Sequence, residues 1–106
     1  MPETLGQLRR RFTKEIALLV IYIDAIPGQE AMLEDGKCKT GHKVNSNHYI
    51  GLAQDISLFI GGVYQTDTEA YRSIGQHWKS MGADHRWGGD FPGDGNHFSF
   101  EYKGRA

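Results

Sequence analysis

Residues 46–59 read SNHYIGLAQDISLF, and the pattern that starts within this stretch decides the fold. Near its end, apolar residues begin to recur at every second position, namely Ile56, Leu58 and Ile60. A period of two predicts a β-strand with one face on the core. The dipeptide Gly61-Gly62 follows directly and predicts a tight hairpin, with VYQT as the returning segment. The same stretch holds His48 and Asp55, two side chains that are able to bind a metal ion.

The segment before this stretch has a helical period. Apolar residues recur there at steps of three and four, at Leu5, Leu8, Phe12, Ile16, Leu19 and Ile23. This spacing predicts a long first helix with one apolar stripe, which Pro27-Gly28 ends. Residues 28–36 (GQEAMLEDG) fit a short helix closed by Gly36, and the polar residues 37–47 predict a loop.

The C-terminal half predicts a second helix and a final strand. Thr66 and Glu69 resemble a capping box, and apolar residues follow at helical steps, at Tyr71, Ile74, Trp78 and Met81. Residues 83–96 are rich in glycine and predict a loop, whereas the alternation in HFSFEY (97–102) predicts a strand. The sequence therefore predicts one small α+β domain over residues 1–106, with two main helices packed on an antiparallel sheet.

Composition limits the classes of function. A formal net charge of −1 over 106 residues argues against a general nucleic-acid binder, which normally carries a basic excess. The single cysteine, Cys38, excludes an internal disulfide; it could be a zinc ligand or a nucleophile, or a plain thiol in a polar loop. No apolar run approaches the roughly 20 residues of a membrane span, and the N-terminus lacks the apolar centre of a signal peptide. We therefore expect a protein that is made in the cytoplasm without stable membrane association. We also expect it to be a monomer.

Three side chains are candidates for one metal site. His48 precedes the predicted strand that contains Asp55, and His97 opens the last predicted strand. If these strands are neighbours, the three side chains can converge on a zinc ion and leave a coordination position for water. Asp94 lies three residues before His97 and is the candidate general base, with Asp90 as a competitor one loop turn away. The alternative for each residue alone is a structural histidine or a turn-forming aspartate.

Two motifs resemble those of a known family. Residues 46–55 read Ser-x-His-x-x-Gly-x-Ala-x-Asp, and residues 87–98 read Trp-Gly-Gly-x(4)-Asp-x-x-His-Phe. Together they resemble the zinc peptidases of the D-alanyl-D-alanine carboxypeptidase and VanX-type group. Within this group, the motifs are most similar to those of the small phage endolysins that are L-alanyl-D-glutamate peptidases. Residues 6–20 also resemble the opening helix of those endolysins.

The resemblance implies that His48, Asp55 and His97 bind one zinc ion and that Asp94 is the general base. It also implies that the substrate is a peptidoglycan stem peptide, cut at the L-Ala–D-Glu bond during phage-driven lysis, once the protein has left the cytoplasm and reached the cell wall. A D-Ala–D-Ala carboxypeptidase or dipeptidase remains an alternative within the group. A zinc-stabilised cell-wall-binding module without turnover is the alternative outside it.

Further residues are candidates for contacts with the substrate. Ser46 could hydrogen-bond within the site or orient a ligand. Trp87 could wall the cleft, with core packing as its alternative, and His85 could line it. Members of the group usually carry an arginine where Ile26 stands here. Gln29 is expected to keep a substrate-orienting role, and Lys37 or Lys39 could supply a positive charge, although neither lysine replaces a guanidinium fork.

Overall fold

The computed structural model describes residues 3–34, 50–90, 94–104 and 106. It opens with helix α1 (Leu5–Ala25), which is capped by the reciprocal hydrogen bonds of a capping box between Thr4 and Gln7. The predicted first helix is thereby confirmed. Its apolar stripe is buried at Phe12, Ile16, Leu19 and Ile23. In the described part of the chain, neither helix has the length and apolarity that crossing a bilayer requires.

The described strands form one five-stranded antiparallel sheet in the order β1-β2-β5-β4, with β3 paired to β2. Their bounds are β1 Gln29–Leu33, β2 Ala53–Ile60, β3 Val63–Tyr64, β4 His85–Trp87 and β5 His97–Phe100. The turn between β2 and β3 has positive φ at both Gly61 and Gly62, as the predicted hairpin requires. The predicted final strand is present as β5 and pairs with β2. Together with the helices this confirms the predicted α+β class.

Three expectations for local structure were wrong. Residues 29–33 form strand β1 rather than a helix, because they pair with β2 from Gln29 opposite Ile60 to Leu33 opposite Ile56. Residues 85–87 form strand β4 inside the segment expected to be a loop. The second helix, α2 (Arg72–Ser80), follows a 3₁₀ turn over Thr68–Tyr71 whose cap is Asp67 rather than Thr66, since the Asp67 carboxylate accepts the Glu69 N–H.

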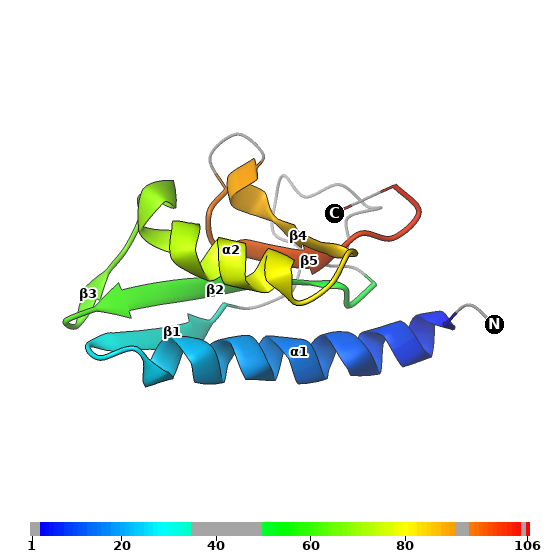
Figure 1. Cartoon of the computed structure of the whole chain (residues 1–106), viewed down its shortest axis with the longest axis horizontal. Coiled ribbons are helices and arrows are strands. Elements are labelled where there is room, and N and C mark those ends of the chain that lie inside the picture. Colours follow the sequence, from blue (N-terminus) through cyan, green and yellow to red (C-terminus); the bar gives the residue numbers. More distant parts are fainter. Residues whose placement is uncertain (1–2, 35–49, 91–93, 105) are drawn as a thin grey trace.

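The two faces of the sheet have different roles. Both helices pack on the face that carries Ile56 and Leu58 of β2 and Phe98 and Phe100 of β5 (Figure 1). The intervening residues of these strands point to the opposite face because side chains alternate along a strand. They include Asp55 and His97. The alternation that builds the core therefore also places the two candidate ligands on the side of the sheet away from the helices.

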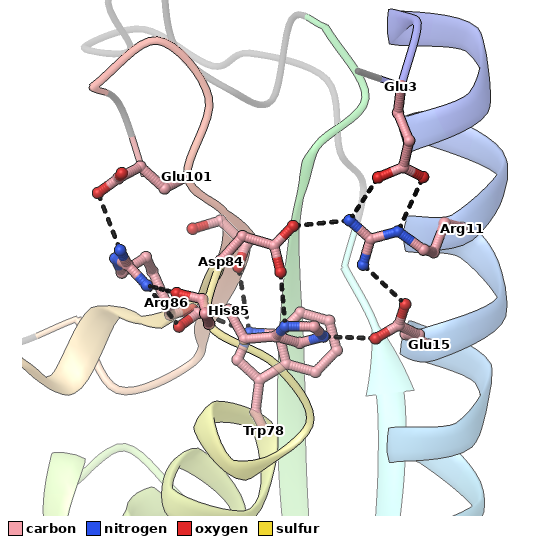
Figure 2. Close-up of polar contacts among 10 residues, drawn as sticks. Glu3, Arg11, Glu15, Trp78, Asp84, His85, Arg86 and Glu101 are labelled. Atoms are coloured by element: carbon pink, nitrogen blue, oxygen red, sulfur yellow. Dashed lines mark hydrogen bonds and ion pairs between the residues drawn. The ribbon is translucent and has the colours of Figure 1, made fainter. Parts of the chain in front are cut away.

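A polar cluster ties α1 to the start of β4 (Figure 2). Arg11 on α1 contacts the carboxylates of Glu3, Glu15 and Asp84 at 3.0, 3.1 and 2.7 Å. The Glu15 carboxylate also lies 2.5 Å from Nε2 of the fully buried His85. Hydrogen bonds to Glu3 and Asp84 raise the pKa of Arg11 above its usual value. Burial acts to raise the pKa of Asp84, but the hydrogen bond and charge of Arg11 outweigh it and lower that pKa.

Replacing Arg11 with glutamine should destabilise the fold by roughly 1–2 kcal/mol near pH 7. The Arg11 guanidinium contacts three carboxylates, and together these contacts contribute more to stability than a single exposed ion pair does. A carboxyl group whose pKa is lowered on folding stabilises the folded protein. This stabilisation is fully present above the pKa of the group in the unfolded protein, about 3.9, and is lost as the pH falls through its pKa in the folded protein. Urea unfolding should therefore show a difference from wild type that shrinks below about pH 4. Arg10→Gln, which alters an exposed neighbour, is the control. A difference that grows on acidification would contradict the Asp84 pairing.

Candidate functional site

Asp55 and His97 face each other directly across two neighbouring strands. They are register partners in the antiparallel pair of β2 and β5, and the Ile56 N–H donates to the Asn96 carbonyl oxygen at 2.8 Å beside them. Direct partners on adjacent strands project to the same face of a sheet. The His97 Nδ1 lies 3.4 Å from the Asp55 Oδ1. His97 is 7% exposed and the Asp55 side chain 26% exposed, so the pair sits at the edge of the buried region.

The separation of this pair suits two ligands of one zinc ion. Nitrogen and oxygen ligands at about 2.0–2.1 Å from a tetrahedral zinc lie roughly 3.3 Å from each other. The observed 3.4 Å between His97 Nδ1 and Asp55 Oδ1 matches this spacing. It is longer than the 2.7–3.2 Å or so of a typical N–H···O hydrogen bond. The two described donors, one imidazole and one carboxylate, therefore fit a zinc ion.

The rest of the predicted site lies partly outside the described residues. His48, the third predicted ligand, and Ser46 both fall in the undescribed segment 35–49. Within the described ranges, no group of three or more histidine, cysteine, aspartate or glutamate side chains could hold a metal ion. Asp55 and His97 would thus need a further ligand such as His48. Cys38, Lys37 and Lys39 also lie outside the described residues.

Asp94 stands next to the pair on the turn that leads into β5. Its Oδ2 is 4.0 Å from the His97 Nδ1, and its side chain is 53% exposed. The His97 N–H donates to the Asp94 carbonyl oxygen at 3.2 Å, which fixes the separation of the two residues locally. Asp90, the competing base, is held by Lys79 Nζ at 2.8 Å instead. The arrangement places a half-exposed carboxylate beside a candidate metal ligand.

Gly88 lets the backbone after β4 pack closely against this turn. A Cβ at Gly88 would lie 2.1 Å from the Asp94 carbonyl oxygen and 2.7 Å from the His97 Cβ. Only a residue without a side chain fits there, so the Trp-Gly-Gly motif has a packing role beside the site. The close packing of Gly88 against the turn of Asp94 and His97 could not be predicted from the sequence.

Three predicted site residues do not lie beside the Asp55 and His97 side chains on their face of the sheet. Trp87 is 0% exposed and lies in the core, which corresponds to its core-packing alternative. His85 belongs to the polar cluster of Arg11 rather than to a cleft. Gln29 lies opposite Ile60, five residues beyond Asp55 along β2. At about 3.3 Å per residue, this is roughly 16 Å from Asp55.

Glu34, which sequence reasoning did not single out, lies much closer to Asp55. Its N–H donates to the Asp55 carbonyl oxygen at 2.9 Å, and its carboxylate accepts a short hydrogen bond from the buried Ser57 hydroxyl. Ser57 is two residues from Asp55 and therefore on the same face. The alternation of β2 could have indicated Ser57. Glu34 could not be found because the strand before it was expected to be a helix.

A comparison with protein families gives this geometry a context. The family described as D-alanyl-D-alanine carboxypeptidase matches residues 40–100. The match covers more than half of the chain and spans both the segment of His48 and Asp55 and the segment of Asp94 and His97. No curated protein matches the chain. The extent of the family match shows that the chain belongs to the D-alanyl-D-alanine carboxypeptidase family of peptidases.

Proposed function

We propose that this protein is a zinc-dependent peptidase that cleaves the L-Ala–D-Glu amide bond in the stem peptide of peptidoglycan. The observation that carries the proposal is the pair of Asp55 and His97, 3.4 Å apart across β2 and β5, with Asp94 on the adjoining turn. A family of peptidases and a pair of side chains at zinc-ligand spacing support the same chemistry. His48, Asp55 and His97 would hold the ion.

Bound zinc would polarise the scissile carbonyl and lower the pKa of a water molecule toward neutrality. The protein's own residues do the remaining work. Asp94 accepts the proton of the attacking water and passes it to the leaving amine, which general acid–base catalysis requires. Its side chain is 53% exposed, and within the described ranges it forms no ion pair with a lysine or arginine, in contrast to Asp90, which pairs with Lys79. His97 is buried, and this restricts the orientation of its ring.

The choice of bond and the biological role follow from the likeness of the motifs to phage endolysins. Ser46-x-His48 and Asp94-x-x-His97 have the order and spacing of the L-alanyl-D-glutamate peptidases of that group. We therefore propose that the protein acts as a monomer in host lysis, on the cell wall, after its release from the cytoplasm.

The second candidate is a D-Ala–D-Ala carboxypeptidase, which the description of the matched family favours. The two activities leave different products. The L-Ala–D-Glu peptidase exposes a new N-terminal D-Glu on the stem peptide, whereas the carboxypeptidase releases free D-Ala and leaves the N-terminus unchanged.

Digestion of purified peptidoglycan by the zinc-supplemented protein, followed by mass spectrometry, tests the proposal. We expect stem-peptide fragments that begin with D-Glu. Release of D-Ala without such fragments would establish the second candidate instead. An unchanged peptidoglycan in the presence of bound zinc would contradict both peptidase activities and leave a binding module.

A further inference from the structure

We infer that Trp87 is a positioning residue, whose buried indole N–H fixes the turn 94–97 and thereby sets Asp94 relative to His97. This inference rests on the proposed function for its catalytic consequence. It assigns Trp87 a role that differs from contact with the substrate. Since the side chain is 0% exposed, it does not contact a substrate itself and would act through the turn.

The turn is held through three consecutive carbonyl groups. The Asp94 carbonyl accepts the His97 N–H at 3.2 Å, and the Asn96 carbonyl accepts the Ile56 N–H of β2 at 2.8 Å. Between them, the Gly95 carbonyl accepts the indole N–H of Trp87 at 2.6 Å. The first two bonds come from the backbone. The third hydrogen bond comes from the side chain of Trp87 at the end of β4. It therefore links β4 to Gly95 in the middle of the turn.

Close packing keeps the indole ring in its position. A Cβ at Gly75 on α2 or at Gly89 after β4 would lie 2.2 Å from an atom of the Trp87 ring. Trp87 is also the register partner of Phe98 on β5. The ring is thus closely approached by α2 and by the segment after β4, and it belongs to the same buried core cluster as Phe98 of β5. A side chain confined in this way can hold the Gly95 carbonyl at one position.

Loss of this hydrogen bond should move the turn. Gly95 is buried, and a buried carbonyl without a partner is unfavourable, so the backbone shifts to regain one. Asp94 is the adjacent residue and would move with it. A displacement of about 1 Å in a catalytic group can cost roughly 100-fold in rate. The ground-state affinity for substrate would change little, because Trp87 lies outside the surface that a substrate contacts.

The two tryptophans of the chain provide a matched pair of variants. Trp78 is equally buried, and its indole N–H donates to the Arg86 and Ser99 carbonyls at 3.0 and 3.2 Å, in strands rather than in the turn (Figure 2). Trp87→Phe and Trp78→Phe each remove one buried donor and keep an aromatic ring. A merely structural role predicts similar effects for both.

Two measurements compare the variants. In metal-free protein, hydrogen exchange at the backbone amide of His97 should be about ten-fold faster in Trp87→Phe than in Trp78→Phe. In zinc-loaded protein, kcat of Trp87→Phe should fall roughly 10- to 100-fold below that of Trp78→Phe, with KM within about two-fold. Equal exchange at His97 in the two variants, or equal kcat, would overturn the positioning role.

The exchange measurement also separates this inference from the proposed function. If wild-type protein binds no zinc and cuts no stem peptide, the proposed function fails, whereas exchange at His97 still decides whether Trp87 fixes the turn. If Trp87→Phe does not fold, Trp78→Phe retains Trp87 as its sole indole. Its Nε1–H should then exchange at the same rate as the His97 amide, since one opening of the turn exposes both. Independent rates would overturn the inference.

Discussion

Replacing Asp94 with asparagine should abolish lysis of outer-membrane-permeabilised cells and leave the bound zinc at the wild-type level. Asp94 lies 4.0 Å from His97 but is not one of the proposed ligands, so its removal spares the metal. An amide cannot accept the proton of the attacking water. The loss of a general base typically costs about 10²–10⁴-fold in kcat. A turbidity assay and metal analysis of the same preparation measure both quantities.

The matched control is Asp90→Asn, on the same glycine-rich segment. Asp90 is held by Lys79, and we expect its loss to leave lysis within about two-fold of wild type. The comparison also addresses the alternative of a binding module, which has no need of a base at position 94. Lysis by Asp94→Asn at the wild-type rate would remove the catalytic assignment, and a rate loss confined to Asp90→Asn would transfer it to that residue.

Removal of the metal should stop cleavage completely, and added zinc should restore it. The same loss should follow from Asp55→Asn, because the amide oxygen is a poorer zinc ligand than a carboxylate. Changes in residues that only support ligands already lower metal affinity by about 10- to 100-fold. We therefore expect the zinc affinity of Asp55→Asn to fall by at least about 100-fold. A competition assay with a chromophoric chelator measures it.

Asp67→Asn is the control for this loss of a carboxylate. Asp67 caps the 3₁₀ turn before α2, and asparagine is an equally good cap, so zinc affinity and stability should be unchanged. Activity that is indifferent to chelation would contradict the metallopeptidase account. Zinc binding unaffected by Asp55→Asn would exclude Asp55 as a ligand.

Much of the fold could be predicted from the sequence because its longer elements carry a clear period. The helical stripe of α1 buries Phe12, Ile16, Leu19 and Ile23, and the alternation of β2 buries Ile56 and Leu58, whereas Ile60 at the end of the strand is 39% exposed. Strand β1 could not be predicted, since its residues 29–33 become a strand by pairing with β2 far along the chain. Strand β4 has only three residues, which is too short for a period to show.

The site was predictable to the extent that it depends on two adjacent strands. The two predicted strands each carry a residue of a type that binds metal ions, which suggested that these strands are neighbours. The observed register places Asp55 opposite His97. The positions of Gln29 and Trp87 depend on features with no local signal. Gln29 is carried away by the antiparallel course of β1, and Trp87 is turned into the core by its pairing with Phe98.

X-ray absorption spectroscopy at the zinc edge of the purified protein tests the central claim most directly. The claim is that His48, Asp55 and His97 bind one zinc ion beside Asp94. It predicts one zinc per chain with only nitrogen and oxygen neighbours, at about 2.0–2.1 Å. A sulfur neighbour at about 2.3 Å would assign the metal to Cys38 instead, and protein that binds no zinc would contradict the account.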